Sequence, residues 1–317
     1  MMKFEWKKLK KPFFVLAPME GATDTVFRQI VIDCAKPDVL FTEFTNTKGL
    51  LSVGNKSVAQ RLKYTKKETP IIAQIWGTDP DSFFKASQQI KDMGFYGIDI
   101  NMGCPEKNIV KKGSCAGLIR NPQLAKEIID AVRRGAPDLP VSVKTRIGFS
   151  SIEPAWIEFL LRQNLDALTI HLRTRKEMSK VPAHWELASQ FVELKNRISP
   201  DTILIGNGDI ENISDGEERI NGTGMDGIMI GRGVFHDPYA FSKDKSLHKL
   251  SREEKINLLI KHLDLFEKTW GDEKKYHPLK RYFKIYINGF DSASDLREKL
   301  METNSILDAR KIIQESD

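Results

Sequence analysis

Eight short apolar segments, separated by segments with helix-like patterns, recur along the first 241 residues of the chain at intervals of mostly about 25 to 45 residues. These segments are Phe13–Ala17, Val39–Phe44, Pro70–Ile75, Ile98–Asn101, Leu139–Thr145, Ala167–His171, Thr202–Gly206 and Gly227–Gly231. Strands that alternate with helices form parallel sheets. Eight such units is the number that closes a (β/α)8 barrel, the TIM barrel, in roughly 240 residues. We therefore predict this α/β fold, with a doubly wound open sheet as the alternative.

After Phe241 the strand pattern does not return. Ser251 followed by acidic residues has the character of a helix N-cap, and it opens a helix to about Trp270. Two more helical segments are expected, near Pro278–Asn288 and Ser292–Glu315. We predict a barrel over residues 1–241 and a small all-helical domain over residues 242–317.

The amino-acid composition limits the cellular compartment and the kinds of partner expected for this chain. Three cysteines without regular spacing do not form a disulfide framework, which indicates a reducing cytoplasm. No segment has the length and apolar character of a signal peptide or a membrane span. The net charge of +6 permits a polyanionic partner without requiring one. We expect a cytoplasmic monomer with no obligate protein partner.

In such a barrel the functional site lies at the carboxyl ends of the strands. The residues expected there are Pro18–Gly21, Glu43, Gln74, Asn101, Cys104, Lys144, Arg146, His171, Asn207–Asp209 and Gly231–Gly233. Two glycine-rich loops after the seventh and eighth strands, with Arg232 in the second, predict an anion site for a phosphate. The alternative is that their glycines only make tight turns. The amine of Lys144, at the end of a buried strand, needs an anionic or hydrogen-bonding partner unless its side chain reaches solvent. His171 either binds a ligand or is a strand-end polar residue whose hydrogen bonds are made within the protein.

Cys104 follows the fourth strand directly, in a loop opened by Gly103 and Pro105. A role of Cys104 as a metal ligand is disfavoured because no second Cys or His lies at ligand spacing, and a nucleophile would need an activating base that is not visible nearby in the sequence. A thiol with a pKa of roughly 8.5 is mostly protonated at neutral pH, so it can act as an acid. Cys34, on an amphipathic helix, is interpreted as inert. Cys115 is either a second mobile thiol or simply a small residue.

Six motifs in register at the strand ends resemble those of the tRNA-dihydrouridine synthases, an FMN-dependent barrel family. The motifs are Ala17–Gly21, Asp99–Pro105, Val143–Gly148, His171–Thr174, Gly206–Asp209 and Asp226–Gly233. The resemblance covers almost the whole chain, including the helical tail. Two positions depart from the family pattern: Ser114-Cys115 after Lys-Lys-Gly, and Ser179 where tyrosine is frequent.

The resemblance implies bound FMN, with NADPH as its reductant. The residues it places around FMN are Pro18, Met19 and Glu20 along the flavin, Gln74, Lys144 and His171 at its polar edge, and Asn207, Gly208, Asp209, Gly231 and Arg232 at its phosphate. A cation beside the flavin edge that becomes negative on reduction is electrostatically favourable. Cys104 would protonate C5 of a uridine flipped out of tRNA, while C6 receives the hydride from flavin N5.

The resemblance also implies contacts with RNA, for which we name Asn101 and Arg146 at the strand ends and Lys280, Arg281 and Lys284 in the tail. Residues 274–290 hold five Lys or Arg and no acid, interleaved with aromatic residues. Charge and stacking could hold RNA there, or the aromatic residues could be core with a solvated basic face. The rival functions are an FMN barrel enzyme acting on a small pyrimidine of the dihydroorotate or dihydropyrimidine type, and a non-catalytic RNA-binding protein.

Overall fold

The computed structural model describes residues 4–316, and nine parallel strands form its single sheet. The strands are β1 (Phe13–Leu16), β2 (Leu40–Phe41), β3 (Thr45–Asn46), β4 (Ile71–Trp76), β5 (Gly97–Met102), β6 (Val141–Arg146), β7 (Ala167–His171), β8 (Ile203–Asn207) and β9 (Gly227–Ile230). β1 pairs with β9, and a bridge between Val15 and Val39 joins β1 to the start of β2. The sheet is therefore closed, which confirms the predicted barrel and excludes the open sheet.

The second predicted strand, Val39–Phe44, differs most from the structure, because it is interrupted. Only Leu40–Phe41 forms a ladder with β4, and a separate short strand, β3, pairs further along the same neighbour. The reason is local: the backbone N–H of Gln74 donates to the Thr42 hydroxyl at 3.0 Å instead of to a backbone carbonyl. The side chain thus takes a bond that the ladder would otherwise use, and the chain leaves the sheet after Phe41.

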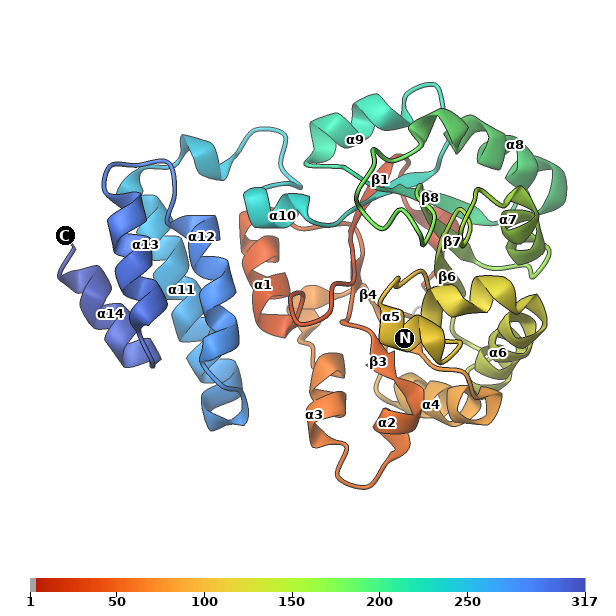
Figure 1. Ribbon diagram of the computed structural model, residues 1–317, viewed down its shortest axis with the longest axis horizontal. Helices are drawn as coiled ribbons and strands as arrows, with labels where there is room; N and C mark the ends of the chain where they lie inside the picture. The colour runs from red at the N-terminus through yellow and green to blue at the C-terminus, as the bar shows by residue number, and fades with distance from the viewer. Residues whose placement is uncertain (1–3, 317) are drawn as a thin grey trace.

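Helices of the barrel cover the outside of the sheet (Figure 1). They are α1 (Thr25–Cys34), α2 (Thr47–Leu51), α3 (Lys56–Ala59), α4 (Pro80–Asp92), α5 (Lys107–Lys111), α6 (Pro122–Gly135), α7 (Pro154–Leu161), α8 (Ala188–Ile198), α9 (Ile213–Ile220) and α10 (Gly233–His236). Asp24, Asp79 and Asn121 cap α1, α4 and α6 by accepting backbone N–H bonds. One core cluster fills the barrel, with Val15, Phe41 and Ile205 in it, and a larger one lies between sheet and helices.

The tail is helical, as predicted, but its helices end elsewhere. α11 (Arg252–Trp270) opens with a capping box between Ser251 and Glu254. The segment expected as Pro278–Asn288 is a 3-10 helix, η8 (His277–Tyr282), followed by the short α12 (Phe283–Tyr286). The helical segment expected over Ser292–Glu315 is confirmed as helical but is divided. It is two helices, α13 (Ala293–Glu302) and α14 (Ile306–Gln314), because Ser305 caps a new helix by accepting from the Asp308 N–H.

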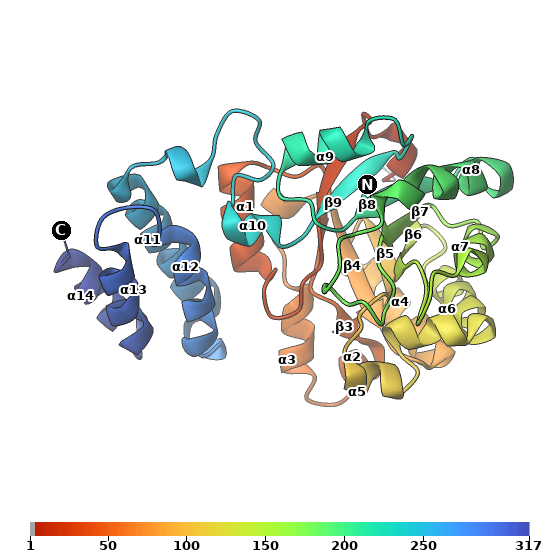
Figure 2. The same ribbon diagram turned by 45° about the horizontal axis from the view of Figure 1, so that its top comes forward.

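The helical tail packs against α1, beside the barrel (Figures 1 and 2). The ring of Tyr282 stacks on Phe27 of α1 with centroids 4.8 Å apart. Asp24, at the start of α1, accepts from Trp270 Nε1 at 3.1 Å and from Lys274 Nζ at 2.9 Å. Within residues 4–316, no helix combines the length and apolar character needed to cross a membrane.

Candidate active site

The carboxyl ends of the strands enclose a cavity of about 170 Å³. Strand register brings polar positions side by side, with Asn101 opposite Lys144 and Arg146 opposite His171. Nine of the eleven residues predicted to bind a cofactor line this cavity: Pro18, Met19, Lys144, His171, Asn207, Gly208, Asp209, Gly231 and Arg232. Glu20 and Gln74 are outside its lining. The motifs of five different strand ends thus converge on one small space.

Two glycines keep one wall of the cavity open. Gly208 has a φ of +128°, and a β-carbon there would lie 2.8 Å from Ala183 Cβ. Such a position admits only glycine without strain. At Gly231 a β-carbon would meet nothing closer than Ala17 Cβ at 3.7 Å and Met19 Sδ at 3.9 Å. A larger side chain at Gly231 would therefore occupy cavity space that a ligand could use.

Asp209 holds two arginines at this wall. One of its carboxylate oxygens accepts from Arg173 Nη2, and the other lies 3.1 Å from Arg232 Nη2. Burial disfavours the charged carboxylate, but the hydrogen bonds from Arg173 and from the Ala183 backbone outweigh it and lower the pKa of Asp209. The contact of Asp209 with a cofactor phosphate stays a prediction. In the structure its carboxylate is engaged by the guanidinium groups of Arg232 and Arg173.

Arg173 is a site residue that the sequence prediction missed. Its side chain is buried, and it donates from Nε to the Val181 carbonyl at 2.6 Å. Its Nη1 lies 3.2 Å from His171 Nε2. A guanidinium can only donate, so Nε2 is the acceptor and the His171 proton sits on Nδ1. The signal available in the sequence was its spacing, since residues two apart in an extended segment point to the same side.

His171 and Lys144 differ in charge at neutral pH. Burial, then the nearby Arg146 and Lys144, hold the pKa of His171 well below its ordinary value, so the imidazole is neutral. Burial, then Arg146, lowers the pKa of Lys144 to about 8, against the attraction of Asp99. Among residues 4–316, no side chain or carbonyl is hydrogen-bonded to the Lys144 amine. The cavity therefore contains a partly buried, unpaired cation that an anionic ligand would stabilise.

Gln74 belongs to a buried relay that leads to Cys104. Gln74 Nε2 donates to Asp99 Oδ2 at 2.7 Å, and Gln74 Oε1 accepts from Asn101 Nδ2 at 3.0 Å. Asn101 Oδ1 in turn accepts the backbone N–H groups of Gly103 at 3.1 Å and Cys104 at 3.0 Å. The Asp99 carboxylate only accepts when ionised, which sets the orientation of both amides. The loop that carries Cys104 is thus held from inside the barrel.

Replacing Asn101 with alanine should release this loop. We expect hydrogen exchange of the Gly103 and Cys104 amides to accelerate about fivefold, since one net hydrogen bond is worth about 1 kcal/mol. Asn108→Ala, which removes an exposed amide from α5 outside the relay, is the control and should leave the exchange of both amides near the wild-type rate. Equal exchange in the alanine variant and the wild type would show that the relay does not hold the loop.

Cys104 is half-buried beside this relay, and its thiol is more acidic than the sequence predicted. A hydrogen bond from the Cys115 thiol lowers the pKa of Cys104 to about 7, with the backbone at Glu106 and the charge of Arg146 assisting against burial. The sequence-based value of roughly 8.5 ignored Cys115. The acid role of Cys104 stays a prediction, and a pKa near the operating pH is the value that favours a general acid.

The contact of Arg146 with substrate stays a prediction. Its guanidinium, buried at 6% exposure, donates to three backbone carbonyls. Nε bonds Gly103 O at 2.8 Å, and Nη1 bonds Thr174 O at 3.0 Å and Met178 O at 2.9 Å. Arg146 therefore ties the Cys104 loop to the loop after β7. Its charge still acts on Cys104 and Lys144, as the pKa shifts of both groups show.

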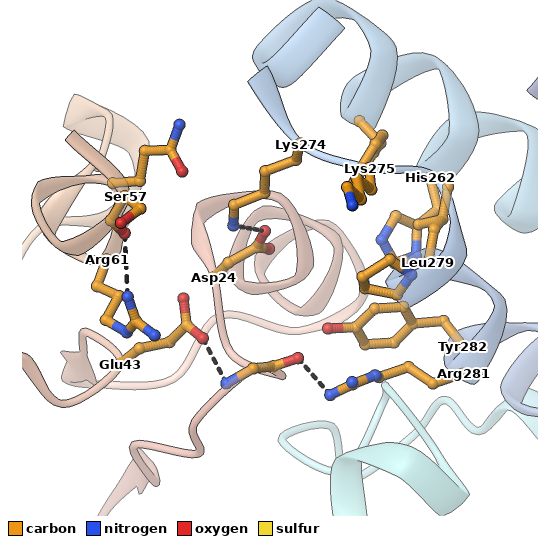
Figure 3. A pocket seen from close by; sticks show the side chains of 14 residues that line it. Asp24, Glu43, Ser57, Arg61, His262, Lys274, Lys275, Leu279, Arg281 and Tyr282 are labelled. Carbon is orange, nitrogen blue, oxygen red and sulfur yellow. Dashed lines mark hydrogen bonds and ion pairs between the residues drawn. The ribbon is translucent and has the colours of Figure 1, made fainter. Parts of the chain in front are cut away.

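A second cavity, of about 330 Å³, lies between the barrel and the tail (Figure 3). Glu20, expected along the flavin, is at the edge of this region in an ion pair with Arg61 at 2.6 Å. Glu43 lines the cavity, accepts from the Gly21 N–H at 2.6 Å, and has its pKa raised to about 7 by burial. From the tail, Arg281 donates to the Gly21 carbonyl. The segment after β1 therefore separates the two cavities.

Three aromatic residues of the basic run, Tyr282, Phe283 and Tyr286, are buried. Of the two interpretations that the sequence left open, core packing describes these three side chains, whereas Tyr276 is partly buried. The basic residues lie differently: Lys280, Arg281 and Lys284 line a surface groove of about 420 Å³ together with Arg297. The positive side chains in this groove are suited to an anionic partner.

Comparison with known proteins agrees with these features. The family model for dihydrouridine synthases matches residues 15–316. The chain is 50% identical over 312 residues to a probable tRNA-dihydrouridine synthase of Staphylococcus epidermidis, covering 97% of this chain and 94% of that protein. It is 46% identical over 314 residues to probable tRNA-dihydrouridine synthase 2 of Bacillus subtilis (strain 168), covering 98% and 95%. Among solved structures, a morphinone reductase variant in complex with tetrahydroNAD is similar in fold, with a TM-score of 0.51, 14% identity, and coverage of 72% of this chain and 85% of that chain.

Proposed function

The chain belongs to the dihydrouridine synthase family, and we propose that it is an FMN-dependent oxidoreductase that reduces the C5=C6 bond of a uridine in tRNA with NADPH as reductant. The observation that carries the proposal is the adjacency of two groups at the ends of β5 and β6. Cys104, an acid with a pKa of about 7, follows one strand, and Lys144, an unpaired cation, lies on the other. Reduction of a polarised ring needs both a proton donor and a stabiliser of negative charge.

The donor set of the cavity fits a flavin nucleotide. Arg232 offers a guanidinium beside the open wall at Gly208 and Gly231, which suits a phosphate. The Lys144 amine and the neutral His171 suit the polar edge of a heteroaromatic ring. Asn207 would contribute through its side-chain Oδ1, since its Nδ2 already donates to the Met229 carbonyl at 2.8 Å and its own carbonyl accepts from the Leu172 N–H at 2.9 Å.

In this mechanism the protein residues hold the base and manage one proton. When bound, FMN supplies the hydride for C6 from its N5, and NADPH restores it. Cys104 donates its proton to C5, and the relay through Asn101 keeps the Cys104 loop in place. Lys144 stabilises negative charge at the ring edge, while Asp209 keeps Arg232 and Arg173 oriented. A uridine must leave the tRNA stack to reach such a buried cavity.

The basic groove of the tail supports tRNA over a small pyrimidine. A small substrate would need only the cavity in the barrel, whereas Lys280, Lys284 and Arg297 form a cationic groove outside it. Such a groove neutralises phosphates along a nucleic acid backbone and releases counterions. We therefore assign the tail a role in holding tRNA against the mouth of the barrel.

Charge reversal in this groove tests the RNA assignment. We expect Lys280→Glu with Lys284→Glu to weaken tRNA binding roughly 10- to 100-fold near 0.1 M salt and to reduce the slope of log affinity against log salt by about two. Arg281 is left intact because it bonds the Gly21 carbonyl. Lys10→Glu with Lys85→Glu changes the charge equally on exposed lysines outside the groove and should leave affinity near wild type. If both double variants show the same slope of log affinity against log salt, the groove does not bind tRNA.

The cofactor assignment has its own test. Purified protein is expected to retain a visible flavin absorbance or to acquire it on addition of FMN, and NADPH should bleach it under anaerobic conditions. A protein that binds neither FMN nor any other flavin would refute the cofactor, whatever its affinity for tRNA.

A further inference from the structure

Cys115 is a buried thiol to which the proposed function assigns no role. It begins the 3-10 helix η4 (Cys115–Arg120) and is wholly buried. Its φ of +53° is in the left-handed region, which residues other than glycine and asparagine rarely adopt. The next residue, Ala116, donates its N–H to the Cys104 carbonyl at 3.3 Å. The backbone of η4 is therefore fastened to the loop that carries Cys104.

This backbone bond places Cys115 directly beside Cys104. The interaction with Cys115 lowers the pKa of the Cys104 thiol. Burial, and then the interaction with Cys104, raises the pKa of Cys115 well above its ordinary value. The pair is therefore asymmetric: Cys104 is the more acidic and the more accessible thiol, and Cys115 is a protected thiol behind it. An accessible thiolate next to a second thiol is the arrangement of peroxide-sensitive cysteine pairs.

We propose that Cys104 and Cys115 form a reversible disulfide when the protein meets a peroxide, and that this modification withdraws Cys104 from its role as proton donor. The inference rests on the backbone bond that places Cys115 beside Cys104 and on the difference in exposure between the two cysteines. Cys34, the remaining cysteine, is buried in the core cluster between sheet and helices, outside this pair.

The chemistry balances with hydrogen peroxide as the oxidant. The Cys104 thiolate attacks one peroxide oxygen, the O–O bond breaks, and hydroxide leaves, so that Cys104 becomes a sulfenic acid. The Cys115 sulfur then attacks the Cys104 sulfur, the S–O bond breaks, and a second hydroxide leaves. The two thiols together lose two electrons and two protons, and one peroxide becomes two waters. A dithiol such as dithiothreitol reverses the bond by thiol–disulfide exchange.

Cys115 would also protect Cys104 from damage. A sulfenic acid without a neighbouring thiol is oxidised further to sulfinic acid, which dithiols do not reduce. With Cys115 in contact, disulfide formation competes with that step. The loss of activity on oxidation rests on the proposed function, but the bond itself does not, because it is read directly from the protein.

The test treats the full chain with hydrogen peroxide under native conditions and then identifies cysteine-containing peptides by mass without reduction. We expect free thiols to fall from three to one, with one cross-linked peptide pair joining Cys104 to Cys115 and Cys34 remaining free. Dithiothreitol should restore all three thiols. Cys34→Ala is the matched control and should give the same cross-link.

Cys115→Ser keeps a hydrogen-bond donor next to Cys104 but cannot form the bond. In this variant we expect Cys104 to accumulate as sulfinic acid, with at least a tenfold smaller fraction recovered by dithiothreitol than in the wild type. Three free thiols after peroxide, cross-links only between separate chains, or equal recovery in Cys115→Ser and wild type would each overturn the proposal. None of these results depends on flavin or tRNA, so failure here is distinguishable from failure of the proposed enzymatic activity.

Discussion

Replacing Cys104 with alanine is expected to lower the rate of dihydrouridine formation in tRNA by about 10²- to 10⁴-fold, the usual contribution of a positioned general acid. Alanine leaves the relay through Asn101 intact, because that relay bonds the backbone N–H of residue 104 and not its side chain. The measurement is a single-turnover assay with the protein reduced beforehand, so that only the step at the uridine is observed.

The pH profile separates the acid role from a structural one. The active form of a general acid is protonated, so the wild-type rate should fall as pH rises through about 7, the pKa of Cys104. The alanine variant should lack this descending limb, and Cys34→Ala should keep both the rate and the limb. A Cys104→Ala protein as fast as wild type would contradict the role of Cys104.

Replacing Lys144 with methionine should have two effects of opposite sign. Affinity for FMN is expected to fall roughly 10- to 100-fold, because a hydrogen bond to a charged group is worth about 1.5–3 kcal/mol. The protein without cofactor should become more stable at pH 7. In the folded state the pKa of Lys144 is lowered to about 8, so keeping its charge costs up to about 3 kcal/mol relative to the unfolded chain.

The energetic cost of the Lys144 charge depends on pH, and this determines whether wild-type stability rises or falls with pH. Below about pH 8 Lys144 is charged in both states and the full cost applies. As pH rises towards about 10.4, only the unfolded chain stays protonated, so the cost shrinks and wild-type stability rises. Lys144→Met should lack that rise, as urea unfolding of the cofactor-free protein at pH 7 and pH 9.5 would measure. Exposed Lys85→Met is the control; equal FMN affinity and stability in both variants would show that Lys144 is not a cofactor cation.

Much of the fold followed from the sequence because the barrel repeats a simple pattern. Each apolar segment is buried on both faces, and all eight positions carry strand. The errors arise where a side chain competes with the backbone. The Thr42 hydroxyl takes a ladder bond from Gln74, and Ser305 opens a new helix where one continuous helix was expected. Such choices depend on three-dimensional partners that a periodic pattern does not contain.

The sequence was enough to predict where the candidate site residues lie, but not which contacts their side chains make. The strand ends converge as expected, yet Asp209 holds arginines, Arg146 binds carbonyls and Glu20 pairs with Arg61. Each role is set by a partner from another strand or loop. The tail shows the same limit, since its basic residues line a groove while its aromatic residues turn inward, and sequence spacing alone left both interpretations open.

The identity of the pyrimidine that the protein reduces is the most direct test of the proposed activity. The purified protein, supplied with FMN and NADPH, would be incubated with a tRNA transcript, and separately with free uridine, uracil and orotate, and the nucleosides and bases analysed by mass. We predict dihydrouridine in the tRNA, dependent on NADPH, and no reduction of the small pyrimidines. Reduction of a small pyrimidine with the tRNA left unmodified would contradict the account and identify the protein as an oxidoreductase of small molecules.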